Sequence, residues 1–361
     1  MNIKIKIEPF LISQNVSIKE AMRQMNEVGE RVLFVVVQQK KLIGSLTDGD
    51  IRRWVLKEGS LLSSLNGVYN LNPISFKNDY DLNEVKNKML ETNVQYIPIV
   101  DKYNRIKDIL IWSQIFGNGT SPLREKIENI PVVVMAGGKG SRLDPFTKIL
   151  PKPLIPIGDK PIIEIILEKF REYDIEEFFI TVHHKSRMIK AFFEEMDTSS
   201  FKIHYIEEEK PLGTAGSLRF LSEYNFKSYL VSNCDIIIEA DYAEICRFHE
   251  VEKYDMTIVG SFRHFMIPYG VCTIENGGIL VNIHEKPEYD FLVNTGMYVI
   301  NKEILKVIPQ DQEFNINELI NKAKKEGFKI GVFPINEKSW IDVGQWEEYH
   351  KGLKHLLGDL K

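Results

Sequence analysis

The sequence of 361 residues is poor in cysteine, with only Cys234, Cys246 and Cys272. Their odd number and the lack of a Cys-x-x-Cys pair argue against a disulfide framework and a zinc site. No apolar run approaches the roughly 20 residues that a membrane helix needs, and the amino end lacks the apolar core of a signal peptide. These absences predict a protein of the reducing cytoplasm without a membrane partner.

An excess of positive charge is also missing, because 46 Lys and Arg residues face 51 Asp and Glu residues. The formal net charge of −5 offers no global positive field, so we expect no nucleic acid as a partner. The hydrophobic content of 43% and the charged content of 27% are typical of a globular protein. The length is sufficient for two domains.

The first third of the chain contains an internal repeat. With a shift of 64 residues, residues 16–51 align with residues 80–115 without a gap. Each copy predicts a helix, a strand, a turn, a second strand and the start of another helix. Gly29 and Asn93 take equivalent positions after the two first helices, where a left-handed backbone favours these residue types. The repeat therefore predicts two β-α-β-β-α units within residues 1–116.

A β-α-β-β-α unit duplicated at this spacing resembles a tandem CBS module. The resemblance implies an adenosine-type nucleotide held by a Ser/Thr-x-x-Asp motif, and a homo-oligomer, because CBS pairs commonly dimerise. The first copy carries the motif as Thr47 and Asp50, whereas the second copy has Ile111 and Gln114, so we expect no second ligand site. The alternative is that Thr47 or the following aspartate only caps the next helix.

The pattern changes after the repeat. Residues 117–130 combine Gly, Asn, Ser and Pro with a charged stretch, which predicts a linker. Residues 131–361 alternate strands with helices, which favours a Rossmann-like α/β domain with a mainly parallel sheet and ligands beyond the carboxyl ends of its strands. The predicted strands are 132–136, 177–182, 202–208, 229–235 and 256–261.

The first of these strands ends in a glycine-rich loop. Gly140 stands where a P-loop has Ser or Thr, and Leu143 stands where a dinucleotide fingerprint has its last glycine. The pattern G-G-x-G-x-R-[LM]-x-P-x-T fits residues 137–147 throughout, and P-K-P-L follows at 151–154. Glycines let the backbone approach a triphosphate closely, and Arg and Lys suit phosphate oxygens. The loop therefore predicts an anion site.

This pattern resembles the signature of sugar-1-phosphate nucleotidyltransferases, which have a GT-A-like fold, and the resemblance covers residues 132–350. It implies transfer of a nucleoside monophosphate from a nucleoside triphosphate to a sugar-1-phosphate, with Mg²⁺ as cofactor and pyrophosphate as a product. The attacking phosphate oxygen is already ionised at neutral pH, so catalysis needs alignment and charge neutralisation rather than a general base. The implied catalytic cations are Arg142, Lys152 and Lys286, and the implied metal ligands are Asp235 and Asp342.

The resemblance also implies binding residues for both substrates, in the segments KPLGTAGSL, YG, EKP and VNTGMYVI as well as the glycine loop. The implied nucleotide-binding residues are Ala136, Gly137, Gly138, Gly140, Glu208 and Gly213. The implied sugar-binding residues are Gly270, Glu285, Asn294 and Thr295.

Glu208 bears on the choice of base, because it lies five residues before Gly213, where uridylyl- and thymidylyl-transferring relatives usually have Gln. An ionised carboxylate only accepts hydrogen bonds, and guanine offers two adjacent N–H donors, so Glu208 favours GTP. The alternative is that Glu208 faces solvent within the run EEEK. The combination of a CBS module with a transferase resembles the glucosamine-1-phosphate guanylyltransferases of bacterial legionaminic acid biosynthesis, and mannose-1-phosphate guanylyltransferases are similar in pattern.

Two other classes of protein fit the sequence less well. A nucleotide sensor with a decayed catalytic half is disfavoured, because the cations and both aspartates of the implied site are present. A glycosyltransferase on a related sheet would be expected to carry Asp-x-Asp in its catalytic half, and the Asp-x-Asp at residues 48–50 lies in the repeat.

Overall fold

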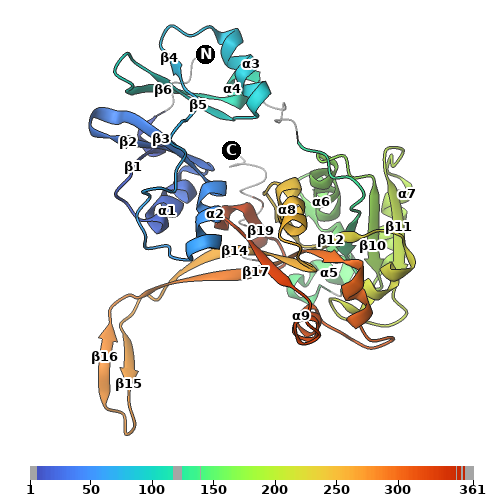
Figure 1. The fold of residues 1–361 in the computed structure, drawn as a ribbon. Helices are drawn as coiled ribbons and strands as arrows, with labels where there is room; N and C mark the ends of the chain where they lie inside the picture. The colour runs from blue at the N-terminus through green and yellow to red at the C-terminus, as the bar shows by residue number, and fades with distance from the viewer. Residues whose placement is uncertain (1–5, 117–123, 139, 347, 351–352, 354–361) are drawn as a thin grey trace. The chain divides into compact units, whose positions relative to one another are not determined.

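A computed structural model describes residues 6–116, 124–138, 140–346, 348–350 and 353 (Figure 1). The chain divides into an amino-terminal unit, Met1–Arg124, and a carboxy-terminal unit, Glu125–Lys361. The division falls within residues 117–130, the predicted linker, of which residues 117–123 lie outside the described part.

The amino-terminal unit contains the duplicated arrangement that the repeat predicts. The first copy consists of β1 (Leu11–Ser13), α1 (Ile18–Val28), β2 (Val32–Val37), β3 (Lys41–Thr47) and α2 (Asp48–Glu58). The second consists of β4 (Phe76–Lys77), α3 (Leu82–Thr92), β5 (Tyr96–Val100), β6 (Ile106–Ile111) and α4 (Trp112–Phe116). In each copy the first strand is parallel to the second, and the second is antiparallel to the third.

The two copies end their first helices in the same way and share a core. Gly29 and Asn93 both take the left-handed conformation, with φ of 82° and 53°, as the sequence predicts. Phe34 of the first copy and Val100 of the second belong to one buried cluster. The Leu42 amide donates to the Asn104 carbonyl over 2.8 Å, which ties the two copies together.

The carboxy-terminal unit is built on a seven-stranded sheet in the order β11-β10-β7-β12-β17-β14-β18. Its strands are β7 (Val132–Met135), β10 (Glu177–Val182), β11 (Lys202–Glu207), β12 (Ser228–Asn233), β14 (Met256–Met266), β17 (Glu288–Asn301) and β18 (Ile330–Ile335). Only β17 runs antiparallel to its neighbours β12 and β14, so the sheet is mainly parallel, as predicted. Strand β14 extends beyond its predicted end at residue 261.

Helical elements cover both faces of this sheet. Val132 and Val134 of β7 pack in one cluster with α6 (Ile162–Arg171), α7 (Ser186–Glu194) and α8 (Tyr242–Val251). Val133 points to the other face and packs in a second cluster with η5 (Gly216–Glu223), η6 (Lys302–Val307) and α9 (Ile316–Lys325). The run of valines in β7 is apolar at every position because both of its faces are buried.

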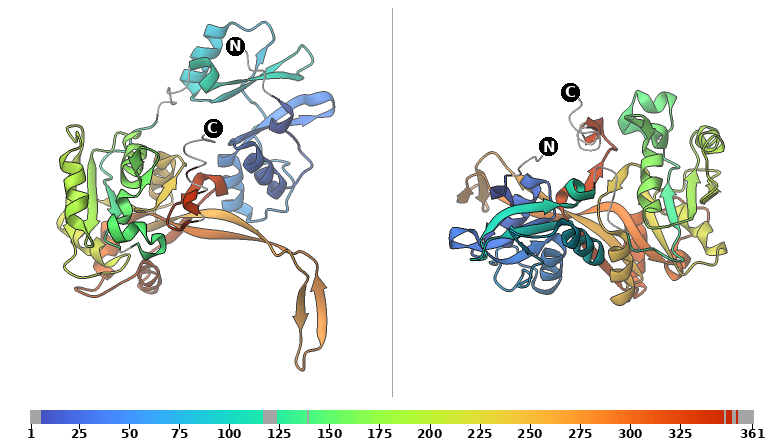
Figure 2. Two further views of the ribbon diagram at one scale, coloured as in Figure 1. Left: turned by 180° about the vertical axis from the view of Figure 1, so that it is seen from behind. Right: turned by 90° about the horizontal axis from the view of Figure 1, so that it is seen from above.

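Shorter elements lie around the carboxyl ends of the parallel strands. They are η3 (Ser141–Leu143), α5 (Phe146–Ile149), η4 (Lys152–Leu154), β8 (Pro156–Ile157), β9 (Lys160–Pro161), β13 (Ile236–Ile238), η7 (Glu337–Ser339) and β19 (Trp340–Asp342). Strands β14 and β17 leave the body as a two-stranded ribbon that ends in the hairpin of β15 (Val271–Ile274) and β16 (Leu280–His284) (Figures 1 and 2). No helix in the described part of the chain is long and apolar enough to cross a membrane.

Candidate active site

Asp235 and Asp342 are held next to each other by a short antiparallel ladder. Asp235 follows β12 at the carboxyl end of the parallel strands, and the next residue begins β13. Ile236 of β13 pairs with Asp342 of β19, and the Val343 amide donates to the Asp235 carbonyl over 2.9 Å. The two predicted metal ligands, more than a hundred residues apart in the chain, therefore lie side by side in the fold.

Lys152 reaches the same place. Its ammonium forms an ion pair with the Asp235 carboxylate, and the two side chains are only 13% and 20% exposed. A Cβ placed on Gly344 would lie 2.5 Å from Asp235 Oδ2, 2.9 Å from Asp342 Oδ1 and 3.1 Å from Lys152 Nζ. Three charged side chains thus converge on a point that only glycine leaves open. Gly344 ends the segment WIDVG of residues 340–344, in which the sequence reasoning assigned a role to Asp342 alone.

The two carboxylates differ in their surroundings. The Asp342 Oδ1 atom accepts a hydrogen bond of 2.7 Å from the Gly344 amide. Burial, and then the negative charge of Asp235, raise the pKa of the Asp342 carboxyl above its usual range. A cation beside this pair would reduce the repulsion between the two carboxylates, and carboxylate oxygens are the ligands that Mg²⁺ prefers.

The donor set fits such a cation. The Asp235 carboxylate already accommodates one positive charge, the Lys152 ammonium. Within the described ranges no three His, Cys, Asp or Glu side chains gather in one place, so the other coordination positions of a Mg²⁺ held by Asp235 and Asp342 would fall to phosphate oxygens and water.

The glycine loop lies beside these groups. Gly140 has φ of 68°, and a Cβ there would lie 2.9 Å from the Lys152 Cβ. A Cβ on Gly138 would meet no atom within 4 Å. The Ala136 amide donates to both the carbonyl and the hydroxyl of Thr181, each over 3.1 Å, so this amide is engaged within the fold. Arg142 lies in η3 and is exposed.

Glu208 lies under the start of the glycine loop. It is 8% exposed, which rules out the alternative that it faces solvent in the EEEK run. Its Oε2 atom accepts from the Leu212 amide over 3.3 Å, and a Cβ on Gly137 would lie 2.7 Å from its Oε1 atom. Burial raises the pKa of the Glu208 carboxyl, against the opposing effect of the Leu212 hydrogen bond. The backbone carbonyl oxygen of Glu208 lies 2.8 Å from His183 Nδ1.

Gly213, the next predicted nucleotide-binding residue, packs closely against residues 314 and 315. It has φ of 77°, and a Cβ there would lie 2.8 Å from the Phe314 carbonyl oxygen and 2.9 Å from Asn315 Oδ1. The sequence reasoning did not single out Asn315, because about a hundred residues separate it from the LGTAG segment and no local pattern marks the contact.

The predicted sugar-binding residues are divided between two places. Asn294 and Thr295 lie on β17, where Asn294 Nδ2 donates to the Tyr298 hydroxyl over 2.8 Å. Thr295 is 3% exposed, and its hydroxyl donates to the Val259 carbonyl over 2.8 Å. That hydroxyl is therefore already satisfied within the protein.

Gly270, Glu285 and Lys286 lie at the base of the β15–β16 hairpin instead. A Cβ on Gly270 would lie 3.0 Å from Glu285 Oε2, so these two residues face each other across the ribbon. Lys286 has φ of 47°, and its amide donates to the Tyr269 carbonyl over 3.3 Å. The structure does not bring these three residues together with the cluster of Lys152, Asp235 and Asp342, because the hairpin extends away from the body of the unit (Figure 1).

In the amino-terminal unit, Thr47 and Asp50 form a capping box at the start of α2. The Thr47 hydroxyl accepts from the Asp50 amide over 3.3 Å, and the Asp50 carboxylate accepts from the Thr47 amide over 2.8 Å. Thr47 therefore caps this helix, whether or not it also binds a ligand. The ligand role of the pair stays a prediction, and the same two oxygens stand at a helix start that suits phosphate.

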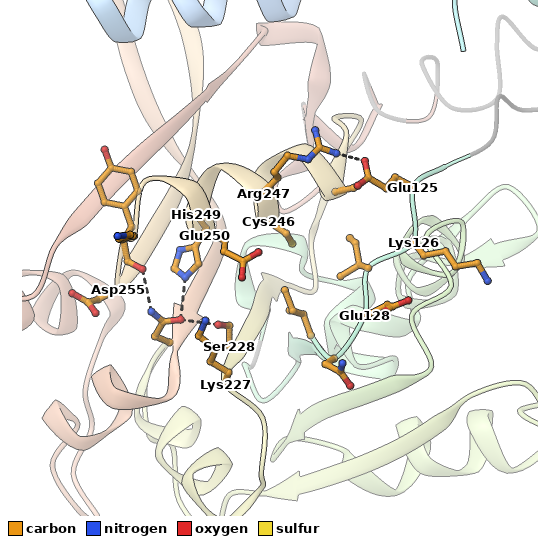
Figure 3. Close-up of a pocket in the computed structure, with 17 residues that line it drawn as sticks. Glu125, Lys126, Glu128, Lys227, Ser228, Cys246, Arg247, His249, Glu250 and Asp255 are labelled. Carbon is orange, nitrogen blue, oxygen red and sulfur yellow. Dashed lines mark hydrogen bonds and ion pairs between the residues drawn. The ribbon is translucent and has the colours of Figure 1, made fainter. Parts of the chain in front are cut away.

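A separate cavity of about 820 Å³ lies at the opposite ends of the same strands (Figure 3). It is lined by Ser228, where β12 begins, and by Ile130, just before β7. An ion pair between Glu125 and Arg247 stands at its edge, and His249 is held there by Thr257 and Asn301. Ligands of parallel α/β sheets bind at the carboxyl ends of the strands, so this cavity is not the nucleotide site.

Comparison with known proteins agrees with this division of the chain. Residues 131–358 match the nucleotidyl transferase family, and residues 4–57 and 67–116 each match the CBS domain. The transferase match covers more than half of the chain.

Individual relatives fall in several branches of nucleotide-sugar chemistry. The chain is 28% identical over 245 residues to a UTP–glucose-1-phosphate uridylyltransferase of Synechocystis, covering 62% of this chain and 63% of the relative. It is 26% identical over 223 residues to a D-glycero-α-D-manno-heptose 1-phosphate guanylyltransferase of Campylobacter jejuni, covering 61% and 97%. The chain thus spans less than two thirds of the first of these relatives.

A solved structure shares the fold of the carboxy-terminal unit. The crystal structure of HddC from Yersinia pseudotuberculosis matches with a TM-score of 0.51 and 25% identity, covering 63% of this chain and 99% of that one. Together with the site geometry, these matches identify the chain as a member of the nucleotidyl transferase family that carries two CBS domains ahead of its transferase domain.

Proposed function

We propose that the carboxy-terminal unit transfers GMP from GTP to a sugar-1-phosphate and releases pyrophosphate. The observation that carries the proposal is the convergence of Lys152, Asp235 and Asp342 beside Gly344, next to a glycine loop whose first residue abuts Glu208. A cationic and a metal-binding group beside a loop of glycines suit a triphosphate.

The reaction joins an oxygen of the sugar phosphate to the α-phosphorus and breaks the bond to the bridging oxygen of the leaving pyrophosphate. Both reactants are anions, so the chain must neutralise charge and align the two groups. Lys152 supplies a charge at the α-phosphate, and exposed Arg142 is placed after the glycine loop to clamp the leaving phosphates. A Cβ on Gly138 would meet no atom within 4 Å, so the backbone there leaves room for the triphosphate to come close.

Mg²⁺ is the proposed cofactor, held by Asp235 and Asp342. Bound there, it would neutralise charge on the nucleotide phosphates as a Lewis acid. Lys152 is paired with Asp235 in this structure. Once Asp235 binds a cation, the Lys152 ammonium would be free to pair with phosphate oxygens of the nucleotide instead.

Glu208 supports guanine as the base. Its carboxylate is buried beside Gly137 and accepts one backbone hydrogen bond, which leaves acceptor capacity for the adjacent N1–H and N2–H of guanine. Guanylyltransferases among the relatives, including that of C. jejuni, support the same choice. Uridylyl transfer is the nearest competing activity, because a uridylyltransferase is also a relative.

Glucosamine-1-phosphate is the proposed acceptor, as in legionaminic acid biosynthesis, with mannose-1-phosphate as the second candidate. The former rests on the combination of two CBS domains with a transferase, and the latter on relatives named mannose-1-phosphate guanylyltransferase. An adenosine-type nucleotide is the proposed ligand of the CBS unit at Thr47 and Asp50.

The test is pyrophosphate release by the full chain with each of GTP, ATP, CTP and UTP against glucosamine-, N-acetylglucosamine-, mannose- and glucose-1-phosphate, with and without Mg²⁺. We expect turnover with GTP and one of the first three sugars only when Mg²⁺ is present. Turnover with UTP alone would overturn the guanine assignment. Nucleotide binding without turnover on any sugar would favour the sensor over the enzyme.

A further inference from the structure

The ribbon of residues 264–291 exposes large apolar side chains in an ordered pattern. Phe265, Tyr289 and Phe291 are 53%, 41% and 52% exposed. Residues 265 and 289 are directly opposed, as are 263 and 291, so all three rings lie on one face of the ribbon. Their centroids are 5.9 Å and 6.3 Å apart. An aromatic cluster on a two-stranded ribbon predicts a surface that another element covers.

The hairpin at the end of the ribbon has one apolar and one polar face. Cys272 opposes Ile283 and Ile274 opposes Leu280, whereas Thr273 opposes Asn282 on the other side. Ile274, Leu280 and Ile283 are 63%, 57% and 56% exposed. This alternation is typical of an antiparallel sheet that packs on a core with one face and meets water with the other.

The apolar face of the hairpin continues into the proposed sugar-binding residues. Gly270 lies two residues before Cys272, and a Cβ on it would contact both Ile283 Cδ1, at 3.2 Å, and Glu285 Oε2, at 3.0 Å. Glu285 therefore shares the face of Ile283. Any surface that covers the apolar face of the hairpin also meets Glu285.

The ribbon does not carry these residues to the phosphate site of its own chain. Arg263 joins the ribbon to the body, since its guanidinium lies 3.0 Å from the Glu337 carboxylate and 4.6 Å from the centre of the Trp340 ring. The ladder continues unbroken from there to the pair of residues 266 and 288, and the Ile267 amide then donates to the Pro287 carbonyl. Four residues of extended strand from Arg263 to Ile267 place the pair of Ile267 and Pro287 about 13 Å beyond Arg263, and the hairpin beyond that pair points away from the body of the unit (Figure 1).

The area on offer suits a stable interface between two chains. The six exposed side chains named on the two faces present on the order of 600 Å², taking about 200 Å² for each fully exposed one, against roughly 800 Å² per partner in a stable complex. A receiving apolar surface lies next to the glycine loop, where Phe146 and Ile149 of α5 are 41% and 73% exposed. The ribbon of one copy and the α5 surface of another can therefore cover each other.

Building on the function proposed above, we propose that two copies of this chain form a two-fold dimer in which each ribbon lies over the α5 surface of the other copy. Glu285 and Lys286 of one copy thereby complete the sugar-phosphate side of the site formed by Lys152, Asp235 and Asp342 of its partner. The two sites are equivalent, as two-fold symmetry requires.

The first experiment uses two differently tagged chains, one with Asp235→Asn and one with Lys286→Ala, co-expressed and purified through both tags. Each homodimer of a variant is expected to be inactive. The mixed dimer has one site in which an intact aspartate pair meets an intact ribbon, so it should recover about half of the wild-type pyrophosphate release. A mixed dimer as inactive as its parents would overturn the proposal, as would full activity of the Lys286→Ala homodimer.

The second experiment reads assembly without activity. Sedimentation should give a dimer for the wild type, and Ile283→Asp with Phe291→Asp should raise its dissociation constant at least tenfold while the far-UV circular dichroism spectrum stays the same. The matched control is Val251→Asp, a 68% exposed apolar residue on α8, which should leave the dimer intact. A wild-type monomer, or a ribbon variant whose dimer dissociation constant equals that of the wild type, would overturn the proposed interface, because a dimer held through the CBS domains alone would be weaker. A dimer that dissociates as expected but never turns over GTP would instead count against the proposed function alone.

Discussion

The Lys152 ammonium lies against the Asp235 carboxylate, although 83 residues separate them in the chain. The pair is mostly buried, and Asp342 stands on the other side of the same small space. One ammonium faces two carboxylates here, so the cluster keeps an excess negative charge that a divalent cation would neutralise. The pair is therefore expected to open when phosphates and a divalent cation enter.

Asp235→Asn should lower turnover by about 10²–10³-fold, because the site loses half of its anionic metal ligands. The melting temperature should also fall, because the mostly buried Lys152 ammonium loses its charged partner, so turnover is compared at a temperature where both proteins are folded. Pyrophosphate release and thermal unfolding are measured on the same preparation. Asp197→Asn is the control, because Asp197 is an exposed residue whose carboxylate accepts a hydrogen bond from the Ser199 amide. Equal losses in both variants would remove Asp235 from the proposed site.

Gly137→Ala and Gly138→Ala should separate packing from ligand approach. A Cβ on Gly137 would lie 2.7 Å from the buried Glu208 carboxylate, so this variant should lose about 1–3 kcal/mol of stability. A Cβ on Gly138 meets nothing within 4 Å, so the free protein should melt at an unchanged temperature. If the triphosphate comes close to Gly138, however, its alanine variant should bind GTP more weakly. Unchanged GTP affinity in a calorimetric titration of Gly138→Ala would argue against that approach.

Glu208→Gln should make the ligand-free protein more stable at neutral pH. Burial raises the pKa of Glu208 in the folded chain, so the folded state holds this proton more tightly than the unfolded state. The stabilising contribution is complete at acidic pH, below the unfolded value, and is lost as the pH rises through the higher folded value. The gain in melting temperature from Gln should be largest at about pH 8 and should shrink towards pH 5. A gain that is the same at both pH values would contradict the raised pKa.

The same variant should change the preference for the base. A glutamine amide both donates and accepts, which complements the N–H between two carbonyls in uracil better than the paired donors of guanine. The ratio of kcat/KM for GTP to that for UTP should fall by about tenfold or more, the value of one lost charge-assisted hydrogen bond. Steady-state rates with the two nucleotides at fixed Mg²⁺ measure it, with Glu207→Gln as the control because Glu207 is exposed at the end of β11.

Thr47→Ala should cost the amino-terminal unit about 1 kcal/mol, because it removes the cap of α2. Ser17→Ala removes an equivalent capping box from α1 of the same copy and should cost a similar amount. Only Thr47→Ala should also weaken binding of an adenosine nucleotide, if the Thr47 hydroxyl holds its phosphate. Chemical denaturation and nucleotide titration of both variants in the full chain separate the two effects. An equal loss of affinity would assign Thr47 a capping role alone.

Local pattern accounts for the parts of the fold that the sequence predicted well. The 64-residue repeat placed α1 and α3 correctly because Gly29 and Asn93 mark the ends of these helices. The end of a helix depends on such residues next to it in the chain, so a local pattern is sufficient to locate it. Strands β10 and β7 were predictable because β-branched and aromatic residues run between turn residues. Strand β14 was predicted too short, since its second half is stabilised by pairing with β17, 22 or more residues further along the chain.

By itself, the sequence determined the two-unit organisation, the alternating strands and helices, and the glycine loop with its following lysine, because each depends on neighbouring residues and on the backbone angles that glycine and proline allow. Only the tertiary structure decided that Asp342 pairs beside Asp235, that Glu208 is buried against Gly137, and that the ribbon carries Glu285 and Lys286 away from the body. These outcomes depend on contacts between segments far apart in the chain, whose partners are chosen by burial and strand pairing across the whole fold rather than by local preference.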